Sequence, residues 1–213
     1  MIVWNAFEIT GTIAFAISGA LIGIEKSLDI FGVIMLSATT AVGGGIIRDT
    51  LIGNSPPMAF RDPSFALISL ISAIAVCIAY SKINRFKNTI QFFDAVGLGA
   101  FTATGASLAL QHNLNTLFIM IVLGFTTAVG GGVLRDIFVK EIPYVFRKEV
   151  YAVASVIGAA GLYFAQPFMS GSLSLYFCFA LTTGIRLFCM KRDLHLPRIG
   201  VNEHFSKKSE SRV

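Results

Sequence analysis

Long apolar stretches separated by short polar segments run through most of the chain. Charged residues are scarce inside these stretches, and a helix needs about 20 apolar residues to cross a hydrocarbon core about 30 Å thick. Seven stretches are long enough, and we expect a membrane-spanning helix in each: residues 5–24, 31–53, 64–81, 91–110, 116–139, 150–166 and 172–190. The pattern therefore predicts an all-α integral membrane protein with seven transmembrane helices.

One eleven-residue string occurs twice in the chain. Residues 39–49 read TTAVGGGIIRD and residues 126–136 read TTAVGGGVLRD. The similarity extends on both sides of the string, so that Glu8 corresponds to Asp94, and it indicates duplication of a whole structural unit. We expect a first three-helix repeat at 1–86, a second at 87–171, a seventh transmembrane helix at 172–190 and a basic cytoplasmic tail at 191–213.

An odd number of spans in each repeat predicts that the second repeat is inverted in the membrane relative to the first. Inverted repeats are a recurring plan of transport proteins, whose sites lie at the repeat interface. With the N-terminus outside, all of the 17 basic residues except Arg48 and Arg61 fall on the inner side. The positive-inside rule therefore predicts a multi-pass protein of the plasma (inner) membrane with an outer N-terminus and a cytoplasmic C-terminus.

The composition supports a membrane protein and limits the partners that we expect. Charged residues make up 14% of the chain and apolar residues 54%, whereas soluble chains carry about 25% charged residues. The net charge of +5 follows from topology and comes without an interleaved basic and aromatic face, so we expect no nucleic acid partner. Cys77, Cys178 and Cys189 lie in or beside apolar runs without metal-ligand spacing. We therefore expect buried thiols, with neither a metal site nor a cofactor.

Polar and small residues follow one face of the second predicted helix and recur in the fifth. Steps of three, four and four residues place them above one another on a helix. The two stripes are Ser37, Thr40, Gly44 and Arg48, and Gly124, Thr127, Gly131 and Arg135. Each stripe passes through a glycine triplet, formed by Gly43, Gly44 and Gly45 or by Gly130, Gly131 and Gly132. Consecutive glycines in a membrane helix indicate a bend, a close helix contact or backbone turned toward a cavity.

Each string ends on an arginine and an aspartate. A charge inside the membrane costs at least about 2.5 to 3.5 kcal/mol, so such residues usually face a bundle interior or a wet cavity. Neighbouring residues project about 100° apart on a helix, so we expect Arg48 to pair with another helix or with water rather than with Asp49. Two interpretations are open: the charges flank a glycine-lined waist in a permeation path, or they are snorkelling helix ends.

The candidate lining or gating residues share a place in these two strings or on the first helix of each repeat. They are Ser18, Ser37, Thr40, Gly43, Gly44, Gly45, Arg48, Asp49, Thr104, Thr127, Gly130, Gly131, Gly132, Arg135 and Asp136. Ser18 and Thr104 could instead only pack helices. Glu8 and Asp94 could attract cations or cap helix N-termini.

On these residues the chain resembles the prokaryotic trimeric intracellular cation (TRIC) channels, a family also catalogued as a duplicated glycine transporter domain (UPF0126-like). The resemblance covers residues 3–190, and the paired GGGxxRD strings carry it. It implies a homotrimer in membrane lipid, a pore in each protomer, second and fifth helices kinked at the glycine triplets, and passive passage of K⁺ and Na⁺. Animal members bind phosphoinositide through basic residues on the fifth-helix motif. Here the second string keeps Arg135 but has no lysine in its glycine run.

We therefore predict a channel permeable to monovalent cations. The alternative is a secondary transporter for glycine or another small solute, because inverted repeats with broken helices suit alternating access equally well. An enzyme is not expected, because His112 falls in a predicted loop and Asp49 and Asp136 fall toward opposite faces. A retinal protein is not expected either, since the span at 172–190 contains no lysine for a Schiff base.

Overall fold

The computed structural model describes residues 2–83, 88–147 and 150–192, and in these every regular element is an α-helix. The helices are α1 (Ile2–Glu25), α2 (Ile30–Leu51), α3 (Met58–Arg61), α4 (Ser64–Ile83), α5 (Thr89–Gln111), α6 (Leu117–Phe138), α7 (Tyr144–Arg147), α8 (Val150–Ala165) and α9 (Gly171–Arg192). Each of the seven expected spans coincides with one of the long helices, to within a few residues at each end. The expected boundary between repeats at 86 and 87, and the tail from 193 onward, lie outside the described residues.

Within these described ranges, five helices are long and apolar enough to cross a membrane: α1, α2, α5, α6 and α9. The apolar parts of α4 and α8 are shorter, at Ser64–Tyr80 and Val150–Ala165. Short helices follow α2 and α6, and each of them opens just after a proline, Pro57 or Pro143. The all-helical membrane class predicted from the sequence is therefore confirmed.

The turns after α1 and α5 have the same construction. Ser27 and Asn113 both take a left-handed backbone conformation, with φ of 56° and 59°. Asp29 is the N-cap of α2 and Thr116 is the N-cap of α6. The side chain of each accepts a hydrogen bond from the backbone N–H three residues further on, at 2.7 Å and 3.4 Å. Side-chain acceptors at this position satisfy a donor that the first helical turn leaves free. The short polar segments between apolar stretches thus fold in the same way in both halves.

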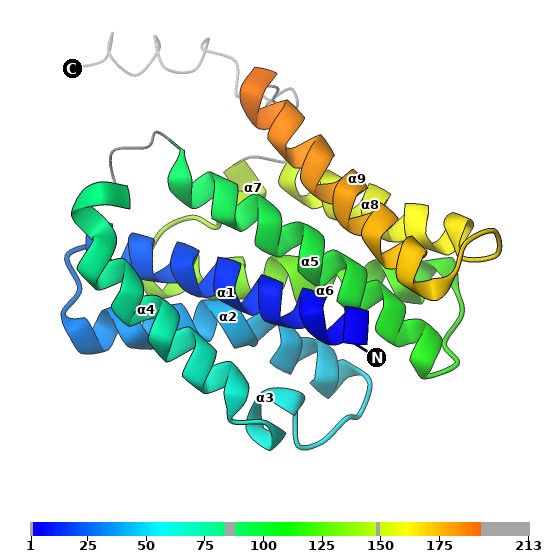
Figure 1. The fold of residues 1–213 in the computed structure, drawn as a ribbon, viewed down its shortest axis with the longest axis horizontal. Helices are drawn as coiled ribbons and strands as arrows, with labels where there is room; N and C mark the ends of the chain where they lie inside the picture. The colour runs from blue at the N-terminus through cyan, green and yellow to red at the C-terminus, as the bar shows by residue number, and fades with distance from the viewer. Residues whose placement is uncertain (1, 84–87, 148–149, 193–213) are drawn as a thin grey trace, which may run out of the picture.

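α1 and α5 pack against each other at the centre of the molecule and run in opposite directions (Figure 1). The ring of Phe101 lies against Gly11, and the ring of Phe15 lies against Gly97. The two rings also meet each other edge to face, with centroids 5.3 Å apart. The contact is therefore reciprocal, because each helix supplies a phenylalanine that occupies the space left by a glycine on the other.

The remaining helices surround this central pair. α2 packs against α1 and α6 against α5, while α2 and α6 also contact each other. α4 covers α1 and α2 on one side, and α8 covers α5 and α6 on the other, with α9 packed against α5 and α8 (Figure 1). Large apolar side chains such as Phe118, Ile78 and Phe168 are exposed on the outside. An apolar exterior over a core that holds charged groups is the pattern of a protein surrounded by lipid.

Candidate functional site

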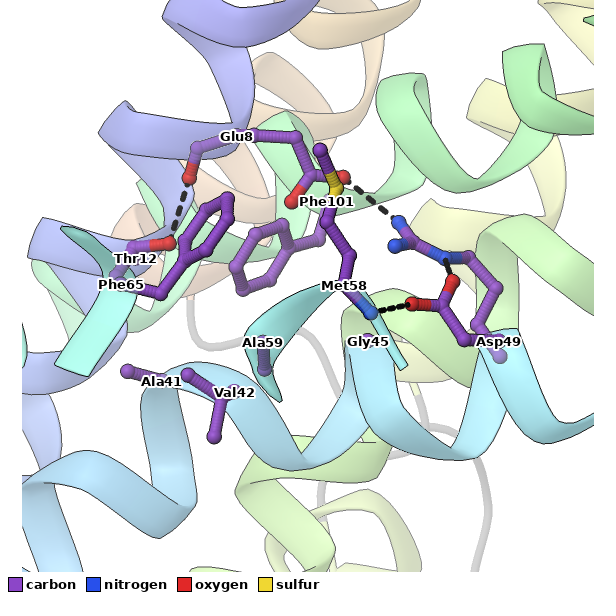
Figure 2. Close-up of a pocket in the computed structure, with 11 residues that line it drawn as sticks. Glu8, Thr12, Ala41, Val42, Gly45, Asp49, Met58, Ala59, Phe65 and Phe101 are labelled. Atoms are coloured by element: carbon purple, nitrogen blue, oxygen red, sulfur yellow. Dashed lines mark hydrogen bonds and ion pairs between the residues drawn. The ribbon is translucent and has the colours of Figure 1, made fainter. Parts of the chain in front are cut away.

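Arg48 lies in the last turn of α2 and is only 2% exposed. Its Nη1 donates to Oε1 of Glu8 on α1 at 2.7 Å, and its Nε donates to Oδ1 of Asp49 at 3.0 Å. The second oxygen of Asp49 accepts a hydrogen bond from the backbone N–H of Met58, the first residue of α3, at 2.7 Å (Figure 2). We call Glu8, Arg48 and Asp49 the Arg48 cluster. It joins α1, α2 and α3 through one guanidinium and two carboxylates.

The second repeat contains the same arrangement around Arg135. Its Nη1 donates to Oδ1 of Asp94 on α5 at 2.5 Å, and its Nε donates to Oδ1 of Asp136 at 2.9 Å. The other oxygen of Asp136 accepts from the backbone N–H of Tyr144, the first residue of α7, at 2.7 Å. Ser18 of α1 also bonds both Arg135 and Asp94, at 2.7 Å and 3.1 Å. We call Asp94, Arg135 and Asp136 the Arg135 cluster.

One expectation about these charges is wrong, and one of the two open interpretations fails. Arg48 does pair with another helix, as expected, but it also bonds its neighbour Asp49, and Arg135 bonds Asp136 in the same way. The long arginine side chain can bend back over its own helix, so the 100° between neighbouring Cβ directions does not keep the charged ends apart. The snorkelling interpretation also fails, because Arg48 and Arg135 are 2% and 3% exposed.

Most of the glycines of the two triplets form the contact between α2 and α6. A Cβ added to Gly44 would overlap the backbone carbonyl oxygen of Thr127, and a Cβ added to Gly131 would overlap that of Thr40. Gly43 faces the Leu134 side chain, and Gly130 faces the backbone of Gly44. Gly45 and Gly132 differ: Gly45 lies nearest to a guanidinium nitrogen of Arg48, and Gly132 lies nearest to the phenol oxygen of Tyr151 and then to a guanidinium nitrogen of Arg135. Of the three uses of consecutive glycines that the sequence left open, the structure shows close helix contact. Both helices continue through their triplets without a break.

The candidate hydroxyl groups are buried and most of them bond backbone carbonyls. Thr40 donates to Leu36 and Thr127 to Leu123, each at 2.6 Å within its own helix. Ser37 donates to the carbonyl oxygen of Ala16 at 2.9 Å, and so ties α2 to α1. Ser18 belongs to the charged network around Arg135, whereas the hydroxyl of its counterpart Thr104 has no partner among the described residues.

A small cavity adjoins the Arg48 cluster. It has a volume of about 20 Å³ and lies among Glu8, Thr12, Arg48, Asp49 and Phe65, with Phe101 and Met58 closing it (Figure 2). A space of this size holds one water molecule. The corresponding pocket beside Arg135, lined by Tyr144 and Tyr151, has no room for a water. No group of three His, Cys, Asp or Glu side chains in the described part of the chain has the geometry of a metal site.

The two acidic residues that complete the clusters, Glu8 and Asp94, stood outside the candidate set. A signal for them was present, because they occupy equivalent positions in the two repeats and each stands alone in an apolar stretch. A charge placed there needs a partner inside the bundle, and the only charges in the expected span that follows each of them, 31–53 or 116–139, are those of an RD pair. Pairing Glu8 with Arg48 and Asp94 with Arg135 would have followed from this argument.

Comparison with known proteins identifies the family. A family model described as "Glycine transporter" matches the chain twice, at residues 5–81 and 91–167. The UPF0126 inner membrane protein YadS of Escherichia coli K12 is 34% identical over 202 residues, covering 92% of this chain and 96% of YadS. A UPF0126 membrane protein of Deinococcus radiodurans is 39% identical over 162 residues, covering 75% of each chain.

Solved structures give the same result. A prokaryotic TRIC channel crystallised in 0.5 M KCl superposes with a TM-score of 0.86 at 37% identity, covering 92% of this chain and 99% of its own. The chain belongs to the TRIC channel family, also named UPF0126. The TRIC orthologue from Rhodobacter sphaeroides is also similar, with a TM-score of 0.85 at 34% identity over 91% of this chain and all of the other. The two matches to the family model start 86 residues apart, the offset between Glu8 and Asp94. Two matches at this offset are what the duplication inferred for this TRIC family chain predicts.

Proposed function

We propose that this protein is a channel for monovalent cations such as K⁺ and Na⁺. The observation that carries the proposal is the pair of buried Arg–carboxylate clusters at the two ends of the glycine contact between α2 and α6. Buried charges in a membrane bundle generally mark ion or substrate pathways. The likeness to solved TRIC channels supports the same function.

We further propose that the two repeats are inverted, with the N-terminus outside and the C-terminus in the cytoplasm. The reciprocal contacts of Phe15 with Gly97 and of Phe101 with Gly11 support this arrangement. Corresponding helices that run antiparallel and exchange equivalent contacts are related by a two-fold axis perpendicular to the helices. For helices that cross a membrane, such an axis lies in the membrane plane. The repeats would then extend over 1–86 and 87–171, with α9 as an added seventh span.

Each protomer of a homotrimer would contain its own pore, passing between α2 and α6. The waist would be bordered by the two glycine triplets, with Thr40 and Thr127 beside them and the two clusters at its ends. In the conformation described here, the direct contact of Gly44 with Thr127 blocks such a route, and the cavity at Arg48 holds only one water. Conduction therefore requires α2 to move relative to α6. The guanidinium of Arg48 or Arg135, bonded to carboxylates on two helices, is placed to control that movement.

Single-channel recording of the purified protein in planar bilayers under a KCl gradient tests this function. Discrete current steps that reverse near the K⁺ equilibrium potential are expected. A preparation that gives no steps, but takes up glycine or another small solute into liposomes in a saturable, gradient-coupled manner, would instead support a secondary transporter. Replacing KCl with NaCl on one side then gives the relative permeability of the two cations.

A further inference from the structure

The two arginine clusters occupy equivalent positions but have different neighbours. Beside the Arg48 cluster lie Met58 and Phe65, while the equivalent positions beside the Arg135 cluster are Tyr144 and Tyr151. The backbone N–H groups of Met58 and Tyr144 make matching hydrogen bonds to Asp49 and Asp136, so the backbone frame is the same in both repeats. The side chains that surround the charges are what differ.

The two tyrosines hold a third arginine that has no counterpart in the first repeat. Arg186 comes from α9, the helix outside the duplication, and is 4% exposed. Its Nη2 donates to the phenol oxygen of Tyr144 at 2.8 Å, and its guanidinium carbon lies 5.1 Å and 5.4 Å from the ring centroids of Tyr144 and Tyr151. A guanidinium over aromatic faces is attracted by the negative charge of the ring faces. Within the described residues, no carboxylate forms an ion pair with Arg186, and its Nε has no hydrogen-bond partner.

Arg186 therefore changes the charge balance at one cluster only. Glu8, Arg48 and Asp49 carry a formal net charge of −1, and so do Asp94, Arg135 and Asp136. The ring of Tyr151 has Arg186 over it and lines one pocket with Arg135 and Asp136, so the third arginine lies beside the cluster. With Arg186 included, the second group is neutral while the first remains negative. The negative group is also the one with space for a water molecule.

We propose that Arg186 is a fixed counter-charge that lowers the cation concentration at the Arg135 cluster and makes the channel conduct unequally in the two directions. This inference rests on the proposed channel function. Cations arriving from the side of the Arg48 cluster meet a net negative charge, whereas cations arriving from the other side meet a neutral group. In water with a Debye length of about 8 Å, a unit charge about 7 Å away changes the local cation concentration by a factor of roughly 1.5. In symmetric KCl, the current is then larger at the voltage that drives cations in from the side of the Arg48 cluster.

The test is the single-channel current at equal and opposite voltages in symmetric 150 mM KCl. Wild-type protein should give a current ratio of about 1.5 between the two directions, by the same estimate. Arg186→Gln should bring the ratio close to one by raising the smaller current. Glu8→Gln should also bring it close to one, but by lowering the larger current. These opposite changes identify the direction without any need to know how a channel is oriented in the bilayer.

Three further measurements separate charge from structure. Arg186→Lys keeps the positive charge but lacks the planar guanidinium, and it should keep the current ratio. Arg192→Gln, at the exposed end of the same helix, is the matched control and should also keep the ratio. In 1 M KCl, where the Debye length falls to about 3 Å, the wild-type ratio should approach one. This measurement uses wild-type protein alone, so it does not depend on whether Arg186→Gln folds. A linear wild-type current in 150 mM KCl, or a ratio unaffected by Arg186→Gln in folded protein, would overturn the inference and leave the channel function standing. A wild-type protein without any current steps would overturn both.

Discussion

Gly44 of α2 lies against the backbone carbonyl of Thr127 on α6, with no room for even one methyl group between them. The same relationship recurs between Gly131 and Thr40, so the two helices touch backbone to backbone at two places. Small residues allow this approach in membranes, where helix association depends on close packing and hydrogen bonds rather than on the exclusion of water. The triplet therefore sets the distance between the two helices that carry the arginine clusters.

The glycine contact predicts different outcomes for alanine substitutions within one triplet. Gly44→Ala and Gly131→Ala should each destabilise the protein by at least about 1 to 3 kcal/mol, because the added methyl overlaps a backbone oxygen that cannot turn aside. Gly45→Ala is the matched control: its methyl would lie 3.7 Å from a guanidinium nitrogen of Arg48, an ordinary contact. It should leave stability unchanged or raise it by up to about 1 kcal/mol through helix propensity. The stability of each variant is measured from its unfolding transition in detergent, monitored by size-exclusion chromatography. Equal effects at the neighbouring positions would contradict the packing described here.

The two central phenylalanines should contribute equally to stability. Phe15→Ala and Phe101→Ala each remove a buried ring that packs against a glycine on the opposite helix, and each should cost about 3 to 5 kcal/mol. Phe118→Ala, at an exposed position on α6, should change stability by about 0.5 kcal/mol or less. Unfolding of the three variants in the same detergent gives the comparison. A large loss for only one of the two central rings would show that the two halves are not equivalent at their interface.

Neutralising the clustered arginines should alter conduction. Arg48→Gln leaves Glu8 and Asp49 as two buried carboxylates without their cation. Breaking a buried ion pair in this way typically costs about 3 to 5 kcal/mol. We expect changed single-channel conductance or open probability for Arg48→Gln and for Arg135→Gln, since each guanidinium ties one helix of the proposed route, α2 or α6, to a neighbouring helix. Arg61→Gln, an exposed residue that bonds only the carbonyl of Ser55 among the contacts described, is the control.

Folding and conduction can be separated with a second substitution. Glu8→Gln combined with Arg48→Gln removes opposite charges together and should recover part of the lost stability, because only one carboxylate then remains. Currents equal to wild type in folded Arg48→Gln and Arg135→Gln proteins would remove both arginines from the mechanism.

The inverted arrangement can be tested at the two turns that share one construction. Ser27 and Asn113 are both exposed, both have positive φ and follow corresponding helices. With Cys77, Cys178 and Cys189 replaced by alanine, Asn113→Cys should react with a membrane-impermeant maleimide in intact cells. Ser27→Cys should react only after the membrane is permeabilised. Labelling of both positions from the same side would rule out inversion of the repeats.

Much of the fold could be predicted from the sequence because membrane burial leaves a strong pattern. The apolar stretches located the long helices, and the doubled string located the helices that carry the clusters. The partners of Arg48 could not be predicted in full, since spacing along one helix does not determine how a long side chain bends or which helix lies opposite. Arg186 also stands alone in an apolar stretch, but its partners could not be assigned, because its helix lies outside the duplication and offers no second copy for comparison. Its role depends on two tyrosines that only folding brings beside it.

The exchange of phenylalanine and glycine between α1 and α5 also bears on the origin of the chain. A surface that fits an inverted copy of itself does not need a covalent link between the two copies. A single three-helix unit with one such phenylalanine and one such glycine could pair with a second unit inserted in the membrane in the opposite orientation. Gene fusion would then have fixed an existing antiparallel dimer in one polypeptide. Two halves joined in this way can diverge, and here they differ at the aromatic pair that receives Arg186.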